Sequence, residues 1–581
     1  MNALYSKMRF GAKNIVLLIV FILIASVAQM LSPAFMSVMI DQGITQKDMG
    51  LIISMAIAMA VIAIISCVCN IIAANISSKV STQVCADIRT AVFEKVSNFS
   101  AAEIDKFGTA SLITRSTADV TTIQTFVSML LRFGILAPMI AVVGLILSVS
   151  TAGEVSIVLA IAVPILLLVT ILLIVAASRY SIKLRHMIDK INQRFLEILE
   201  GVRVIRAFNK QKHETERFKE TNEETTAVSR KQIRISGSLV PIVNMLFGFT
   251  SLTVMAVGTG YVAYGQMDVG VLVAATQYIN IILLAIIMLT YVVSLLPDAM
   301  TCMRRINDVL STEISIKDPE KPEPPQTCKG TVEFKNVTFA YPNADEPVIK
   351  GISFISRPGE TTAIIGRTGC GKSSVVKLIP RLYDTLFGEV LVDGVNVKQY
   401  KMDHLRDLVG YVPQKNVLFS GDIASNLNFG KENGTEEDWK EAVRIACASE
   451  FVDKKDGVYH SPISQGGTNL SGGQRQRMAI ARAVMKKAEV YIFDDSFSAL
   501  DMKTDRQLRM NLKESMGDAT MIVVAQRVST IMDATRIIVL DKGEAVGIGT
   551  HKELLKSCQL YREIAEIQLG KEVVENEIAC A

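Results

Sequence analysis

The sequence has almost no surplus of charge of either sign. Its 61 lysine and arginine residues are nearly balanced by 57 aspartate and glutamate residues, so the formal net charge is +4 over 581 residues. Proteins that hold nucleic acid through a basic surface need a stronger positive field than this. Nucleic acid is therefore not an expected partner, and the placement of the basic residues matters more than their number.

Cysteine patterns typical of metal sites or disulfide frameworks are also missing. The nine cysteines are scattered without metal-ligand spacing, and Cys67 and Cys69 lie inside an apolar run. Such positions favour reduced, buried thiols over disulfides or zinc ligands. We therefore expect the soluble part of the chain to lie in the cytosol.

Long apolar runs are what the sequence has in abundance. Half of the residues are hydrophobic, 20% are charged, and the mean hydropathy of +0.35 is too high for an ordinary soluble protein. Six charge-poor runs each approach or exceed the roughly 20 residues that span a bilayer. They are Asn14 to Ile40, Met49 to Ile76, Ser128 to Ser150, Val155 to Ala177, Leu239 to Tyr264 and Val269 to Leu296. No small-residue cleavage pattern ends the first run, so it is not expected to be a signal peptide that is removed. We therefore expect all six runs to form transmembrane helices, with the lipid bilayer as a partner.

The connections between these runs predict the orientation. The short connections DQGITQKDM, TAGE and GQMD contain Lys47 as their single basic residue, whereas Ser77 to Val127 and Ser178 to Ser238 contain many lysines and arginines. The positive-inside rule places both long segments, and with them both termini, in the cytoplasm. Their polar helical periodicity predicts transmembrane helices that continue well beyond the bilayer.

The composition changes after residue 310. The stretch KDPEKPEPPQ has the proline-rich, charged character of a stiff linker, which we assign to residues 311–329. Residues 1–310 form the predicted transmembrane domain. Residues 330–581 alternate short apolar strands, among them TVEFKNVTF, TTAIIG, VYIFD and TMIVVA, with helical stretches, which is typical of a soluble α/β domain.

A glycine-rich loop follows one of these strands. GRTGCGKSS fits the phosphate-loop pattern G-x-x-x-x-G-K-S, comes directly after TTAII and opens the predicted helix KSSVVKLIPRLY. The backbone N–H groups of such a loop face nucleotide phosphates, with Lys372 on the β and γ oxygens and Ser373 on Mg²⁺. The predicted cofactors are ATP and Mg²⁺, and the predicted loop contacts are Gly366, Arg367, Thr368, Gly369, Cys370, Gly371, Lys372, Ser373 and Ser374.

Cys370 carries a separate expectation. It stands among the loop amides at a helix N-terminus and beside Lys372, and both features lower the pKa of a thiol. We therefore expect a depressed pKa at Cys370, with alkylation that ATP prevents.

A second motif lies upstream of the strand VYIFD. That strand ends at Asp494, a position at which we expect a carboxylate to hold Mg²⁺ through water. The sequence LSGGQRQRMAIARA precedes this strand. Leu470 to Gln474 resembles the signature motif of ATP-binding-cassette (ABC) proteins. Six helices followed by one cassette is similar to the layout of an ABC exporter half-transporter over the whole chain, and most similar to the bacterial heterodimeric multidrug exporters. The resemblance implies a multi-pass protein of the bacterial cytoplasmic membrane, with the cassette in the cytoplasm.

The resemblance also implies how the motifs work together. In the family two cassettes meet head to tail, and each ATP lies between one cassette's phosphate loop and the other's signature motif. Tyr341 matches the aromatic residue that stacks on adenine, Gln414 the glutamine that touches Mg²⁺ or the attacking water, and Asp501 the end of the loop SALD that passes between the two sites. The signature residues are Leu470, Ser471, Gly472, Gly473 and Gln474, and the implied metal-site residues are Ser373, Gln414 and Asp494.

Two positions depart from the family pattern. Asp495 stands where a catalytic glutamate normally follows the metal-binding aspartate, and Gln526 stands where a histidine normally reads the γ-phosphate. The side chain of aspartate is one methylene shorter than that of glutamate. A displacement of ~1 Å in a reacting group can slow a reaction on the order of 10²-fold. Glutamine can donate a hydrogen bond, but it cannot carry positive charge or shuttle a proton as imidazole does.

The intact LSGGQ motif decides how we interpret these departures. We predict a heterodimer with a second, non-identical ABC half-transporter. In it, this chain's phosphate loop builds a slow, degenerate site, while its signature motif completes a competent site on the partner. The alternative is a homodimer in which Asp495 serves adequately as the base.

The membrane half gives less specific signals about how it is coupled to the cassette and about which substrates are transported. Residues 100–115 and 201–218 match the coupling helices that fit into the cassettes of this family. We expect export of hydrophobic or amphipathic substrates such as drugs, lipids or peptides; a homodimeric lipid flippase and an ATP-gated channel or sensor are the alternatives. The carboxamides that either line a pathway or bridge helices are Gln29, Asn70, Asn244, Gln277 and Asn280.

Overall fold

The computed structural model describes residues 4, 8, 11–153, 156–323, 329–342 and 344–580. They form two compact units, one from Met1–Asn98 and Gly108–Thr312 and the other from Phe99–Phe107 and Glu313–Ala581. Residues 324–328, which fall in the predicted linker, lie outside the described residues.

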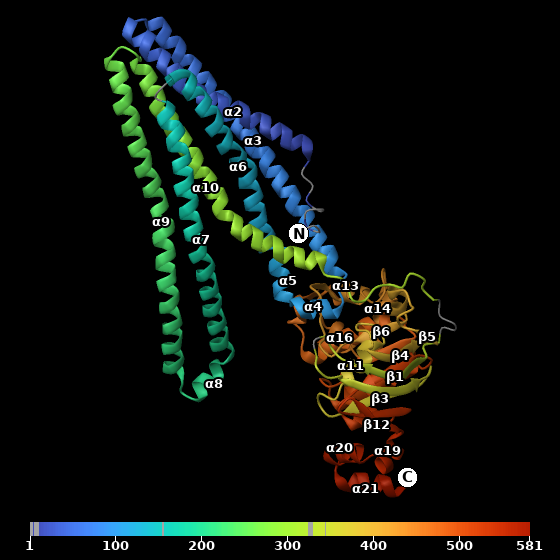
Figure 1. Cartoon of the computed structure of the whole chain (residues 1–581). Coiled ribbons are helices and arrows are strands. Elements are labelled where there is room, and N and C mark those ends of the chain that lie inside the picture. The colour runs from blue at the N-terminus through green and yellow to red at the C-terminus, as the bar shows by residue number, and fades with distance from the viewer. Residues whose placement is uncertain are drawn as a thin grey trace. The chain divides into compact units, whose positions relative to one another are not determined.

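The first unit is built from long helices (Figure 1). They are α2 (Ala12–Val38), the π-helical η1 (Met39–Ile44), α3 (Met49–Ser97), α5 (Thr109–Ser116), α6 (Ala118–Ala152), α7 (Ser156–Glu200), α8 (Val202–Ala207), α9 (Gln211–Ala263) and α10 (Val269–Ser311). In the described part of the chain, 6 helical stretches are long and apolar enough to cross a membrane, which confirms the predicted number. The 53 residues of α9 extend roughly 80 Å at ~1.5 Å per residue, so this helix is longer than the roughly 30 Å thickness of a bilayer core, as the prediction of extended helices requires.

Local sequence explains where a helix begins and why interior prolines are tolerated. Asp48 caps α3, because its carboxylate accepts hydrogen bonds from the N–H groups of Gly50 (2.9 Å) and Leu51 (3.1 Å).

In a membrane bundle, neighbouring helices and local adjustments satisfy the backbone groups that a proline frees. Prolines lie inside α2, α6, α7, α9 and α10, at Pro33, Pro138, Pro164, Pro241 and Pro297.

Helix α10 takes part in two apolar clusters of this unit. Its Tyr278 packs in one cluster with Ile22 of α2 and Ile140 of α6. The next residue, Ile279, packs in the other cluster with Leu166 of α7. Adjacent residues point to different sides of a helix, so α10 joins the two helix groups of the bundle.

The second unit contains two main sheets. One is antiparallel with the order β2-β1-β4-β5; in the other, with the order β12-β11-β3-β10-β9-β6, all strands but β12 run parallel. The strands are β1 (Val332–Phe339), β2 (Ile349–Ser356), β3 (Thr361–Gly366), β4 (Phe387–Val392), β5 (Val395–Asn396), β6 (Val409–Val412), β7 (Gly421–Asp422), β8 (Pro462–Ile463), β9 (Val490–Asp494), β10 (Thr520–Val524), β11 (Arg536–Asp541) and β12 (Glu544–Gly549).

Helices alternate with these strands, as the sequence predicts for an α/β fold. They are α4 (Ala101–Phe107), α11 (Lys372–Leu378), α12 (Met402–Asp407), α13 (Ile423–Asn428), α14 (Glu436–Ile445), α15 (Ser449–Val452), α16 (Gly472–Met485), α17 (Met502–Ser515), α18 (Val528–Ile531), α19 (His551–Ser557), α20 (Gln559–Leu569) and α21 (Lys571–Cys580). The four strands predicted by sequence are confirmed as β1, β3, β9 and β10. Helix α11 ends at Leu378, earlier than predicted, because Pro380 has no N–H to continue the helical hydrogen bonds and Arg381 has a φ of +50°.

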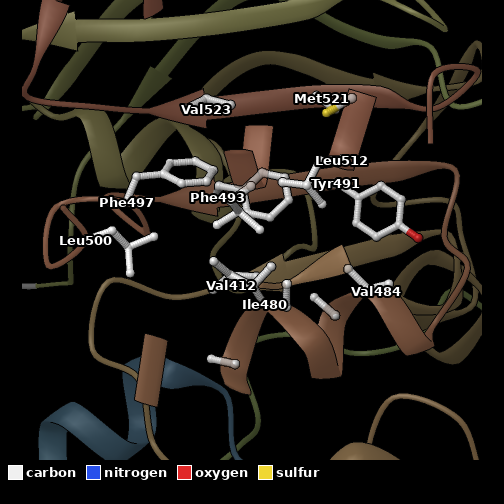
Figure 2. Close-up of a cluster of buried hydrophobic side chains, with 14 of the residues drawn as sticks. Val412, Ile480, Val484, Tyr491, Phe493, Phe497, Leu500, Leu512, Met521 and Val523 are labelled. Atoms are coloured by element: carbon white, nitrogen blue, oxygen red, sulfur yellow. The ribbon is translucent and has the colours of Figure 1, made fainter. Parts of the chain in front are cut away.

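The buried parallel strands position the candidate site. All residues of β9 and β10 are buried, as expected for central strands that are covered on both faces. In Figure 2, Phe493 of β9, Val523 of β10 and Ile480 of α16 belong to one cluster of buried side chains. This packing fixes the carboxyl end of β9, where Asp494 emerges.

Helix α4 belongs to the second unit although it comes from the N-terminal half of the chain. Ala101 and Ala102 pack against a buried cluster of that unit, and the hydroxyl of Tyr383 donates to the Asp105 carboxylate at 3.0 Å. Helix α4 falls within residues 100–115 and α5 begins there and ends at Ser116, whereas α8 falls within 201–218, where α9 also begins. The assignment of these segments as coupling helices stays a prediction.

Candidate nucleotide-binding site

The glycine-rich loop connects β3, which ends at Gly366, to α11, which begins at Lys372. Gly369 and Gly371 have φ angles of +84° and +99°, a region in which a side chain would be strained. A Cβ atom added at Gly369 would meet nothing within 4 Å. The loop therefore has the conformation and the open space that a phosphate cradle needs.

The ammonium group of Lys372 lies over this loop. Its Nζ donates to the carbonyl oxygens of Gly366 (2.9 Å) and Arg367 (3.0 Å). Phosphate oxygens are stronger partners for an ammonium than neutral carbonyls are, because the hydrogen bond is then charged on both sides. This position fits the predicted contact of Lys372 with nucleotide phosphates.

Ser373 and Asp494 meet at the next position of the site. Ser373 Oγ donates to Asp494 Oδ1 at 2.7 Å, and the Tyr411 hydroxyl donates to Oδ2 at 3.4 Å. Asp494 is 1% exposed. This burial raises the pKa of its carboxyl group, against the lowering effect of the Ser373 hydrogen bond. A buried carboxylate beside a hydroxyl fits Mg²⁺, which prefers oxygen ligands. Ser373 and Asp494 would hold the ion, which supplies positive charge beside the phosphates.

Asp495 accepts hydrogen bonds from both predicted carboxamides. Gln526 Nε2 donates to Asp495 Oδ2 at 2.8 Å, and Gln414 Nε2 donates to the same oxygen at 3.4 Å. Burial raises the pKa of Asp495, while Gln414, Lys372 and Gln526 act to lower it. Its backbone φ of +51° lies in a region that aspartate tolerates better than most residues do. We call Gln414, Asp495 and Gln526 the amide–carboxylate triad.

A glutamine that no sequence motif predicted holds the backbone of this triad at Asp495. Gln476 of α16 is buried; its Nε2 donates to the Asp495 carbonyl at 3.3 Å, and its Oε1 accepts from the Ala499 N–H at 3.2 Å. Its place on the buried face of the helix that follows LSGGQ is the signal that would have found it. Through Gln476, the signature helix and the loop after β9 are held in one arrangement.

A second missed glutamine holds the segment that contains Gln526. Gln568 of α20 donates from Nε2 to the Gln526 carbonyl at 2.8 Å and accepts from the Val528 N–H at 2.7 Å. The same helix carries Glu563, whose carboxylate lies 3.5 Å from the Arg367 guanidinium. No local motif marks Gln568, because its partners lie about forty residues away in sequence.

The signature motif begins α16. Ser471 Oγ accepts from the Gln474 N–H at 3.3 Å, and Gln474 Oε1 accepts from the Ser471 N–H at 3.0 Å, which is a capping box. Leu470 is buried, and a Cβ added at Gly472 would meet nothing within 4 Å. The N-terminal end of α16 is therefore rigid and open to the approach of an anion.

Tyr341 and Asp501 both have partners inside the second unit. The Tyr341 hydroxyl is hydrogen-bonded to Ser374 Oγ at 2.9 Å, which holds its ring beside the glycine-rich loop. Asp501 caps α17 by accepting from the Thr504 N–H at 3.0 Å. Stacking of Tyr341 on adenine and a role for Asp501 between two sites stay predictions.

The expectation of a depressed pKa at Cys370 is wrong. The thiol is 5% exposed and belongs to an apolar cluster with Ile364 and Val375. Burial raises the pKa of Cys370, and this outweighs the opposing effects of Lys372 and the loop amides. The side chain is turned into the core, so Cys370 is not an accessible alkylation site.

Both the transmembrane region and the nucleotide-binding region of this chain match known protein families. Residues 15–286 match the ABC transporter transmembrane region, and residues 349–498 match the ABC transporter domain. An uncharacterised ABC transporter ATP-binding protein of Mycobacterium tuberculosis is 38% identical over 550 residues, which are 94% of this chain and 94% of that protein. The ATP-dependent lipid A-core flippase of Syntrophus aciditrophicus is 27% identical over 578 residues, which are 98% of this chain and 94% of the flippase.

A solved structure shares the fold. The structure of a bacterial Atm1-family ABC exporter with ATP bound has a TM-score of 0.78, with 23% sequence identity, and the match covers 95% of this chain and 97% of that one. This likeness confirms the predicted fold class, a six-helix membrane region followed by an α/β nucleotide-binding domain.

Proposed function

This chain belongs to the ABC transporters, as an exporter half-transporter with one transmembrane region and one ATP-binding cassette, and we propose that it acts as one subunit of a heterodimer. ATP hydrolysis by the family's cassette drives transport. In our proposal, the phosphate loop of this chain forms a slow site, and its signature motif completes a competent site on a non-identical partner. The complex exports hydrophobic or amphipathic compounds across the bacterial cytoplasmic membrane, with both termini and the cassette in the cytoplasm.

The amide–carboxylate triad is the observation that carries this proposal. Oδ2 of Asp495 accepts hydrogen bonds from two neutral carboxamides, at 2.8 and 3.4 Å. These two bonds engage both lone pairs of Oδ2, so this oxygen has no free position from which to accept a proton from water, although burial raises the pKa of the carboxyl group. Gln526 cannot take up a proton in exchange, because an amide is neutral at all relevant pH values. The triad therefore favours a site that binds ATP and hydrolyses it slowly.

The signature helix supports the complementary half of the proposal. Its N-terminal residues keep the capping box and open glycine that a phosphate partner requires. An intact signature motif completes a competent site when a second, different cassette supplies the catalytic base. A chain with a slow phosphate loop can therefore still contribute to hydrolysis. The contacts of α4 with Tyr383 and the surrounding cluster support its assignment as a coupling helix.

Pairing is tested by co-expression. Two copies of this chain with different affinity tags are produced together with a candidate half-transporter that has glutamate after its metal-binding aspartate and histidine in its switch loop. Purification through one tag should recover the candidate and not the second copy. Recovery of the two tagged copies together, in equal amounts and without the candidate, would establish the homodimer instead.

Pumping is tested separately from pairing. Inside-out membrane vesicles that contain the complex should accumulate a fluorescent amphiphile above its external concentration when MgATP is added, because a pump does work against a gradient. An ATP-gated channel would bring the two concentrations only to equality.

A lipid flippase is the second candidate function. The relative named ATP-dependent lipid A-core flippase, with which this chain aligns over 98% of its length, favours it. Leaflet-specific quenching of a fluorescent lipid in reconstituted vesicles distinguishes the two functions, since a flippase moves the lipid between leaflets without releasing it.

A further inference from the structure

A cavity of about 430 Å³ lies within the membrane unit between α2, α3 and α10. This volume is in the range of small-molecule sites, roughly 300 to 1,000 Å³. Its walls combine small, apolar and polar side chains, and it is lined by Ala28, Gln29, Ser32, Pro33, Met59, Ile62, Ala63, Ser66, Cys67, Asn70, Gln277 and Ile281.

The polar part of this lining is unusual for a membrane-spanning region. Three carboxamides, Gln29, Asn70 and Gln277, and two hydroxyls, Ser32 and Ser66, line one cavity, and its described lining residues include no charged side chain. Each carboxamide has two N–H donors and an oxygen with two lone pairs. The cavity therefore offers neutral donors and acceptors in a surrounding that is otherwise apolar.

The hydrogen bonds of the protein leave part of this capacity unused. Asn70 Nδ2 donates to the carbonyl and hydroxyl oxygens of Ser66, at 2.9 and 3.4 Å, and Ser66 Oγ donates to the Ala25 carbonyl at 3.3 Å. Among the described residues, neither Gln29 nor Gln277 makes a hydrogen bond to a protein group. These two glutamines therefore do not bridge helices, which was one of the two roles that the sequence left open.

An unpaired carboxamide in a membrane bundle is unfavourable, because hydrocarbon offers no partner for its donors and acceptors. Asn280, one turn beyond Gln277 on α10, shows the ordinary solution, since its Nδ2 donates to the Thr276 carbonyl one turn back at 3.1 Å. Gln29 and Gln277 instead line a shared cavity. A ligand with matching groups would satisfy both.

We propose that this cavity is a binding site for the polar part of an uncharged amphiphile that carries both donors and acceptors, such as an amide with hydroxyl groups. The proposal rests on the export function proposed above and specifies its substrate class. Charged headgroups are excluded because the lining has no opposite charge to compensate their desolvation. The apolar side chains of Met59, Ile62 and Ile281 contact the adjoining hydrocarbon of the same molecule.

Transport by the full complex in sealed vesicles tests the proposal. The probes are a BODIPY-labelled ceramide, which is neutral and carries one amide and two hydroxyls, and rhodamine 6G, a cation. Gln29→Leu and Gln277→Leu should each lower ceramide uptake at subsaturating concentration about tenfold, as expected for a lost buried hydrogen bond. Asn280→Leu is the matched control on the same helix and should leave uptake unchanged.

A gain of function provides an independent arm. Gln29→Glu places a negative charge in the cavity, so rhodamine 6G uptake should rise and ceramide uptake should fall. A variant that lowers the uptake of both probes equally, with ATPase activity retained, would overturn the assignment of Gln29 to the ligand site.

Cys67 supplies a binding readout that does not depend on transport. Its thiol is free and exposed, and it lines the cavity. Ceramide should slow its reaction with a membrane-permeant maleimide, followed by mass spectrometry of the peptide, whereas rhodamine 6G should not. The protection should weaken about tenfold in concentration in Gln277→Leu and persist in Asn280→Leu. Equal labelling with and without ceramide would overturn the proposed site.

The two proposals fail in different ways. If ceramide protects Cys67 in a Gln277-dependent manner but MgATP accumulates neither probe, the site stands and the export function is wrong. If MgATP accumulates ceramide equally well in Gln29→Leu, Gln277→Leu and Asn280→Leu, export stands and the site is wrong.

Discussion

At the scale of single residues, the buried carboxylate of Asp494 is suited to binding a cation but lowers the stability of the fold. Asp494 is buried at the end of β9, and burial raises the pKa of its carboxyl group. A raised pKa means that the folded state binds the proton more tightly than the unfolded state does. Asp494 therefore favours folding fully below its unfolded pKa, and this contribution is lost as the pH rises through its folded pKa. At neutral pH the ionised carboxylate opposes folding until a cation neutralises it.

Asp494→Asn should for this reason raise the melting temperature of the nucleotide-free complex at pH 7.5 and reduce the extra stabilisation by MgATP, because the partner's site still binds the nucleotide. Thermal unfolding of the complex in lipid nanodiscs, with and without MgATP and EDTA, measures both effects. The gain should shrink as the pH is lowered towards 5, since the wild-type carboxyl group then takes up its proton.

Asp422→Asn serves as a control of opposite sign. Burial acts to raise the pKa of Asp422, but hydrogen bonds from Ser425 and His460 outweigh it and leave the pKa lowered. Removing this charge should lower the melting temperature at pH 7.5. An Asp494→Asn complex that melts below wild type without nucleotide would refute the account of this carboxylate.

At the scale of elements, helix α20 fixes the segment that carries Gln526. Gln568 forms two hydrogen bonds to the backbone of Gln526 and Val528, so the orientation of the triad depends on a helix that no motif identifies. Strand β10 ends just before this segment, and its burial makes the near end rigid. Gln568 therefore restrains the other end.

Gln568→Leu should increase amide hydrogen exchange at Val528 about fivefold, because one hydrogen bond contributes about 1 kcal/mol. Gln559→Leu, on the same helix, is the control, since the Gln559 side chain donates within the helix to Glu563. Hydrogen–deuterium exchange of the purified complex, resolved at residues 524–530, gives the measurement. Unchanged protection at Val528 in Gln568→Leu would show that α20 does not hold this segment.

The elements also show what sequence can and cannot predict. The strands β3, β9 and β10 and the glycine-rich loop were predictable, because each is a contiguous pattern with a local physical cause. Gln476 and Gln568 were missed because their partners come from distant segments. The error at Cys370 has a similar origin: sequence places the residue in the loop, but only packing turns its thiol into the core.

At the scale of the whole molecule, the proposed complex joins two different chains whose half-sites have unequal chemistry. In this proposal, this chain contributes the slow phosphate loop and the intact signature motif. In a homodimer, by contrast, Asp495 would be the candidate base in both sites. The two arrangements therefore predict different effects for a mutation of Asp495, a small loss of activity in the heterodimer and a large one in the homodimer.

Steady-state ATPase activity of the assembled complex tests this claim most directly. Asp495→Asn should change the rate by less than about twofold, because the site that it serves contributes little turnover, whereas Ser471→Arg should nearly abolish activity by blocking the partner's competent site. Thermal unfolding confirms that each variant is folded. A loss of about 10² to 10⁴-fold in Asp495→Asn, the range expected when a general base is removed, would contradict the account.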